Sequence, residues 1–130
     1  MLHYFKRTER DKEFFDAYID PRLPERLFDM HLHITRPCDA SGVSQEMIDR
    51  DWAMQCGFLM DENDLTEYCK TLWQGRSVAV NAFPMPIRGI DLKSANDYLE
   101  VLLHHRKPDT AVTIRTAELA ISPTFDPDEC

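Results

Sequence analysis

Basic charge and paired cysteines are both scarce in this chain of 130 residues, and each shortage excludes a class of protein. Lys and Arg number 15 against 23 Asp and Glu, which gives a net charge of -8. Negative charge opposes contact with phosphate backbones and anionic membranes, so we expect no nucleic-acid partner. The 4 cysteines include no C-x-x-C pair. This disfavours a zinc ribbon and predicts free thiols in a reducing compartment.

Long apolar runs are also missing. Charges interrupt the N-terminal stretch MLHYFKRTERDKEFF, so it has no signal-peptide core, and no later stretch is long enough to span a bilayer. We therefore expect a cytoplasmic protein without a membrane partner. The 43% of hydrophobic residues is enough for one core, and no repeat or linker divides the chain. A single domain over residues 1–130 is predicted.

The residues that are present predict helices alternating with strands. Apolar residues recur at helical spacing over 9–19, 65–73 and 95–103, the last ending near Lys107. The residues expected to cap these helices are Thr8 with Asp11 in a capping box, Asn63 or Asp64, and Ser94. Strands are predicted near 27–34, 77–83 and 117–122, the last ending at ELAIS. This order is typical of a parallel α/β sheet with right-handed crossovers.

The first and second strands differ in pattern. SVAVNAF, residues 77–83, has little polar alternation, as expected for a parallel strand covered on both faces. LFDMHLHI, residues 27–34, alternates strictly instead. One side of this strand is apolar, with Phe28, Met30, Leu32 and Ile34. The other side is polar, with Asp29, His31 and His33.

The polar side of the first strand is a candidate metal site. Residues i and i+2 of a strand point the same way, with Cα atoms about 6.5 Å apart, so His31 and His33 can converge on one ion. A turn-rich loop begins at Thr35, where α/β folds place their active sites. Asp29, one step deeper, could ligate weakly, orient an imidazole or pair with a buried cation. The alternative is that both histidines are ordinary polar residues of a strand.

Asn81 lies near the end of the second strand. Its amide either faces the same pocket or satisfies backbone groups.

The motif D-M-H-L-H, Asp29 to His33, resembles the D-x-H-x-H opening of the amidohydrolase superfamily, metal-dependent hydrolases with a TIM-barrel fold. The run from Leu65 to Leu99 is similar in order and character to the region after that opening in the amidohydrolase-related branch, which includes decarboxylases. The resemblance covers about Leu23 to Pro127, and its specific part is the histidine motif.

The resemblance implies one or two divalent ions, often zinc, held by His31 and His33 together with ligands from later strands. A metal-activated water would attack a carbonyl or related centre of a small organic substrate, and Asp29 would have a supporting role. The family's later ligands are unmatched, since His104 and His105 fall at the end of a helix, where cations interact favourably with the helix terminus. A complete barrel needs about 250 residues. The resemblance therefore predicts a partial (β/α) barrel of about three parallel strands, the N-terminal part of a hydrolase.

Other functions stay open beside this one. A decarboxylase of the same family would use the same histidines. A truncated remnant without catalysis would be stable only as an oligomer or with a missing C-terminal segment. An independent small α/β binding module would use His31 and His33 as ordinary strand residues.

Overall fold

A computed structural model describes residues 7–55, 57–104 and 112–121 of the chain. Its centre is a parallel sheet with strand order β1-β2-β3. The strands are β1 (Arg26–His33), β2 (Ser77–Phe83) and β3 (Val112–Ala117). The predicted α/β class with three parallel strands is confirmed. The third strand, predicted near 117–122, covers Val112–Ala117 instead and ends before ELAIS.

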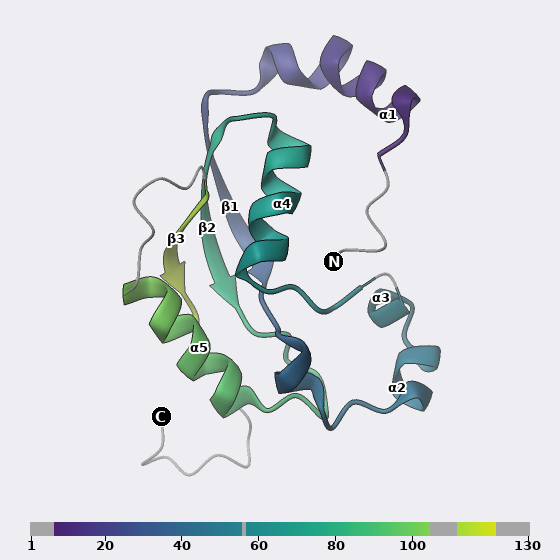
Figure 1. Ribbon diagram of the computed structural model, residues 1–130, viewed down its shortest axis with the longest axis vertical. Helices are drawn as coiled ribbons and strands as arrows, with labels where there is room; N and C mark the ends of the chain where they lie inside the picture. Colours follow the sequence, from purple (N-terminus) through teal and green to yellow (C-terminus); the bar gives the residue numbers. More distant parts are fainter. Residues whose placement is uncertain (1–6, 56, 105–111, 122–130) are drawn as a thin grey trace.

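Two helices connect the strands and pack on the same face of the sheet (Figure 1). Helix α4 (Glu62–Trp73) joins β1 to β2, and α5 (Leu92–His104) joins β2 to β3. Because strand order follows chain order, crossovers of one hand bring both helices to one side. They bury one core with the strands, built on Leu65, Cys69, Val78, Val80, Ala82, Leu99 and Leu102.

The other face of the sheet has no covering helix among the described residues. Along β2, burial alternates: Val78, Val80 and Ala82 are 0–1% exposed, whereas Ala79, Asn81 and Phe83 are only partly buried. We call the two sides the covered face and the open face. The expectation that β2 is covered on both faces is wrong for the part of the chain described.

The helix caps differ from those predicted for α4 and α5. Asp61 caps α4, and its Oδ1 accepts from the backbone N–H groups of Asn63 and Asp64, the two residues expected as caps. Asp91 precedes α5 and accepts from the N–H of Ser94 at 3.0 Å, so Ser94 lies inside the first turn. Each helix begins earlier than its apolar stripe because a carboxylate upstream satisfies the free N–H groups.

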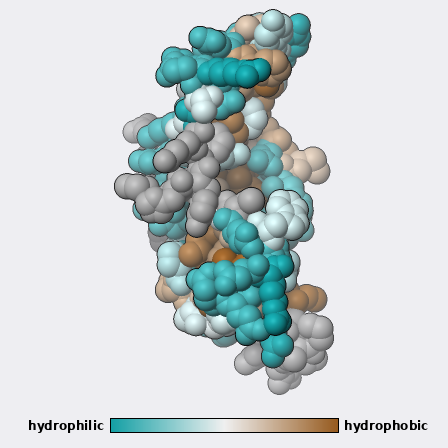
Figure 2. Space-filling view, turned by 90° about the vertical axis from the view of Figure 1, so that its right-hand side faces the viewer, coloured by the Kyte–Doolittle hydropathy of each residue, from teal (hydrophilic) through white to brown (hydrophobic). Residues whose placement is uncertain are grey.

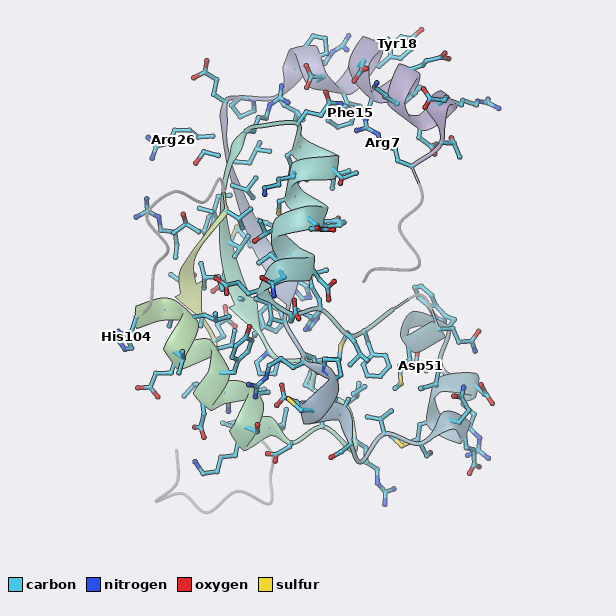
Figure 3. All side chains as sticks on the ribbon, in the orientation of Figure 1. Arg7, Phe15, Tyr18, Arg26, Asp51 and His104 are labelled. Atoms are coloured by element: carbon cyan, nitrogen blue, oxygen red, sulfur yellow. The ribbon has the colours of Figure 1, made fainter. Side chains whose placement is uncertain are left out.

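The N-terminal helix is confirmed with its predicted cap. Thr8 and Asp11 form a capping box for α1 (Glu9–Phe14), which continues as a π-helical turn, η1, over Phe15–Ile19. A 3-10 turn, η2 (Asp20–Arg22), follows. The Arg7 guanidinium lies 4.5 Å from the Phe15 ring centre and donates to the carbonyl of Thr71 on α4 at 3.0 Å. Figure 3 shows Arg7 and Phe15 on the side of this segment that faces α4, and Tyr18 on the opposite side.

The rest of the described surface is mixed in character. On the N-terminal helical segment, hydrophobic and hydrophilic atoms lie next to one another (Figure 2), and Phe14 is 57% exposed.

The loop after β1 carries η3 (Pro37–Ala40), α2 (Gln45–Arg50) and α3 (Trp52–Gln55). Within the described ranges Cys38 and Cys69 are free thiols, as predicted for those two. No helix in these ranges is long and apolar enough to cross a membrane.

Candidate metal centre

A β-bulge interrupts β1 just before the histidine pair. Asp29 lies beside Val80 of β2, and Leu32 lies beside Ala82, with a shift of register between the two pairs. From Asp29 to Leu32 the chain advances three residues along β1, while the paired strand β2 advances two, from Val80 to Ala82. Strand β1 therefore contains one additional residue here. Because one residue is added, side chains that would share a face of the strand lie on opposite faces before and after the bulge. The alternation predicted from the sequence therefore does not hold across the bulge.

The bulge moves Asp29 away from the histidines. In register with Val80, Asp29 lies on the covered face, where its charge adds to burial in raising the pKa of the Cys69 thiol on α4 to about 11. Phe28 and Met30, predicted to share the apolar side with Leu32, are 53% and 73% exposed. The prediction that Asp29 faces the same side as His31 and His33 is wrong, while its supporting role stays a prediction.

His31 and His33 lie side by side on the open face. Their ring centres are 5.0 Å apart, with the planes at 83°. Phe83, which is in register with His33, meets both rings edge-on, at 4.7 Å from His31 and 4.4 Å from His33. The end of β2 therefore supplies an aromatic wall against which both imidazoles rest.

The protonation of His33 is defined by a backbone carbonyl. Nδ1 of His33 lies 3.3 Å from the carbonyl oxygen of Pro84, the residue after β2. A carbonyl only accepts, so Nδ1 carries the hydrogen, and Nε2 of the neutral ring keeps its lone pair. Burial lowers the pKa of His33 below 6.5, more than the bond to Pro84 raises it. This arrangement, with one ring nitrogen donating to a carbonyl, is the one in which metal-bound histidines are usually held.

The spacing of the two rings is comparable with that of two imidazole ligands on one zinc ion. Two imidazoles on a tetrahedral Zn²⁺ have ring centres about 5 Å apart, given Zn–N bonds of about 2.0 Å, which agrees with the 5.0 Å between His31 and His33. Among the described residues, however, no group of three or more His, Cys, Asp or Glu side chains is placed to hold a metal ion. A zinc site with the usual four ligands would need further ligands from elsewhere.

A polar network holds the loop after β1 against α5. The buried Asp39 carboxylate accepts from Nε and Nη2 of Arg36 at 2.9 and 2.7 Å and from Ser94 Oγ at 2.8 Å. Burial raises the pKa of Asp39, but these bonds outweigh it and hold the pKa below 3.8. Arg36 also lies 4.1 Å above the ring of Tyr98. These bonds hold the loop after β1 in a fixed position against α5.

The two loops at this end of the sheet also touch through backbone alone. A Cβ at Gly42 would lie 2.7 Å from the carbonyl oxygen of Gly89, so the contact tolerates only glycine there. Gly89 itself has φ of +93°, which favours glycine again.

A cavity of about 420 Å³ adjoins His31 along β1. Residues of both faces line it, including Leu27 and Asp29 of the covered face and Phe28 and His31 beyond it. The cavity therefore wraps around the outer edge of β1, which has no partner strand within the described ranges. Its lining is mostly apolar, with Trp73 contributing from α4.

Sequence patterns located the histidines and missed the groups that hold them. Phe83 and the Pro84 carbonyl could be found only from the register that sets Phe83 beside His33. His104 ends α5, at the side of the sheet where β3 begins, far along the helix from the strand ends that carry the pair. His105 lies outside the described residues.

Comparisons of the chain with protein-family models, with curated proteins and with solved structures find no match in any of the three.

Proposed function

We propose that this chain is the N-terminal part of an amidohydrolase-like, metal-dependent hydrolase, in which His31 and His33 are two ligands of one divalent ion, with zinc expected. The observation that carries the proposal is the pair of imidazoles 5.0 Å apart, with Nδ1 of His33 bonded to the Pro84 carbonyl. A metal bound there would lower the pKa of a coordinated water toward neutrality and polarise the carbonyl of a small organic substrate.

The chain's own residues prepare the pair for this role. Burial favours the neutral form of His33, the form that binds metals, by lowering its pKa. The Pro84 carbonyl fixes the hydrogen on Nδ1, so Nε2 is the nitrogen that would face an ion. Phe83 limits the rotation of both rings by its edge-on contacts.

The order of the strands supports the barrel part of the proposal. In a (β/α) barrel, consecutive parallel strands are neighbours, all helices lie outside, and active sites form at the carboxyl ends of the strands. Here β1, β2 and β3 are consecutive neighbours with α4 and α5 on one face. The free edge of β1 and its apolar cavity are where a further strand would pair. Under this proposal the remaining ligands come from segments outside the described residues.

Zinc titration of the purified chain tests the proposal. We expect about one equivalent of zinc to bind, and the double variant His31→Ala, His33→Ala to bind more than about 100-fold more weakly, because both nitrogen ligands are gone. The variant His104→Ala, which removes an exposed histidine at the end of α5, is the matched control and should bind as the unaltered chain does. Calorimetry and elemental analysis give affinity and stoichiometry.

Equal and negligible binding by all three proteins would reject the metal site in this chain. A non-catalytic remnant or an independent α/β module would then be favoured. Sharp two-state unfolding of a monomer, unchanged by a chelator, would support the module. Within the family, release of carbon dioxide from a carboxylated substrate would distinguish a decarboxylase from a hydrolase.

A further inference from the structure

The carboxamide of Asn81 connects all three strands on the open face. Nδ2 donates to the carbonyl oxygen of Met30 in β1 at 3.3 Å and to Oε1 of Glu118, just after β3, at 2.6 Å. Oδ1 accepts from the hydroxyl of Thr116 in β3 at 2.6 Å. Because the carbonyl and the carboxylate both accept, the orientation of the amide is determined by its partners.

The bond to Met30 reaches the peptide group that carries His31. The carbonyl of Met30 and the N–H of His31 belong to one peptide unit, and this unit lies in the bulge, where the ladder to β2 is broken. Asn81 donates to its carbonyl, and Oδ1 of Asp29 accepts from its N–H at 3.0 Å. Two side chains thus take the place of the strand partners that a bulge lacks.

The position of this peptide unit, which includes the Cα of His31, affects where the His31 side chain lies. A shift of the Met30–His31 peptide would move the Cα and Cβ atoms of His31, and with them the ring that lies 5.0 Å from the ring of His33. His33 has independent support, since Ile34, the next residue, donates to the carbonyl of Phe83 at 3.0 Å. Of the two histidines, His31 depends on side chains for the placement of its backbone.

We propose that Asn81 is a positioning residue of the histidine pair, which fixes the Met30–His31 peptide and so holds the imidazole of His31 beside that of His33. Thr116 and Glu118 hold the amide in turn, which couples the pair to β3. This inference rests on the proposed function only in taking a metal ion as the ligand of the pair. The arrangement of the rings is a property of the chain without metal.

The variant Asn81→Ala tests the role, and Asn96→Ala is its matched control. The side-chain amide of Asn96, on α5, also makes two hydrogen bonds to backbone. Its Nδ2 donates to the carbonyl of Ala120, and its Oδ1 accepts from the N–H of the same residue. The first measurement is amide hydrogen exchange without metal. In Asn81→Ala the His31 N–H keeps its bond to Asp29 but should exchange about 5- to 10-fold faster, because its peptide loses the hydrogen bond at the Met30 carbonyl. The N–H of Ile34 in this variant, and the N–H groups of His31 and Ile34 in Asn96→Ala, should change far less.

The second measurement is zinc affinity. Loss of a group that orients a ligand typically weakens metal binding about 10- to 100-fold, so Asn81→Ala should bind zinc at least about tenfold more weakly, and Asn96→Ala should bind normally. If Asn81→Ala does not fold, Asn81→Leu keeps the approximate volume without adding a charge beside Glu118 and removes the donor to Met30, and the same results are expected of it.

The outcomes separate the two proposals. If the unaltered chain binds no zinc, the proposed function fails, and the exchange comparison alone decides the role of Asn81. Equal acceleration at His31 and Ile34 would overturn that role, because it indicates general loss of stability. Faster exchange at His31 with unchanged zinc affinity would also overturn it, since the imidazoles would then keep their arrangement without the amide.

Discussion

The two faces of the sheet use alternate residues of the same strands for different purposes. On the covered face, Val78, Val80 and Ala82 are 0–1% exposed and pack under α4 and α5. On the open face, the alternate positions of β2 bring Asn81 and Phe83 next to His31 and His33. Burial of the first set stabilises the fold, while contacts in the second set orient polar groups. The comparison teaches that stability and candidate chemistry can be altered separately here.

The covered face should give the largest loss of stability. Leu99 of α5 is 0% exposed in the core. We expect Leu99→Ala to lower the free energy of unfolding by about 4 kcal/mol, because it removes buried methyl groups and leaves a cavity. Urea denaturation measures the change. A loss below about 1 kcal/mol would mean that neighbouring side chains fill the space left by Leu99. The covered face would then not dominate the stability of the fold.

The Asp39 network should rank second. Asp39→Asn keeps the side-chain volume and removes the charge that accepts from Arg36 and Ser94. We expect a loss of about 2 to 3 kcal/mol, moderated because the Arg36 side chain is 28% exposed and regains some hydration.

The acid dependence of stability provides a check on Asp39. Its folded-state pKa lies below 3.8, so its contribution is present above pH 3.8 and is lost as the pH falls through the folded-state pKa. The stability difference between the unaltered chain and Asp39→Asn should therefore shrink in strong acid. A constant difference down to that range would contradict the assigned ion pair.

On the open face, His33 should make stability depend on mildly acidic pH. Its folded-state pKa is lowered below 6.5, chiefly by burial, so the unfolded chain binds more protons between the two values. Stability should be full above pH 6.5 and should decline as the pH falls through that window. His33→Asn should remove this decline when both proteins are unfolded with a chelator present. An unchanged slope would assign the dependence to other groups.

The smallest effect is expected at Met30. Its side chain is 73% exposed in the bulge, so Met30→Ala should change the free energy of unfolding by less than about 0.5 kcal/mol. Thermal and urea unfolding both measure this. A loss above about 1 kcal/mol would show that Met30 is covered in solution, and the contrast between the two sides of β1 would be weaker than described.

Several features of the fold could be predicted because they depend on neighbours in sequence. The capping box of Thr8 and Asp11, the strand over 77–83 and the alternation of helices with strands all follow from local patterns, and the structure confirms them. The starts of α4 and α5 were misplaced because several consecutive polar residues can cap a helix, and the apolar stripe does not distinguish among them.

The candidate site was predicted in part. H-x-H spacing places His31 and His33 on one side of a strand whatever its partners, and the structure brings their rings together. Asp29 went to the other side because one additional residue in the bulge inverts the alternation, and a bulge leaves no periodic signal. Phe83 reaches the pair, and Asn81 reaches Met30, from a strand that is distant in the chain, since Asn81 follows Met30 by 51 positions.

The sequence by itself determined the order of the helices and strands, and that two imidazoles share one side of β1, because these properties repeat with the local period of the backbone. Only the tertiary structure decided the register between β1 and β2, the bulge, the bond of Asn81 to the Met30 carbonyl and the contacts of Phe83 and Pro84 with the pair. Register depends on how side chains of distant segments pack together, and no local pattern contains that information.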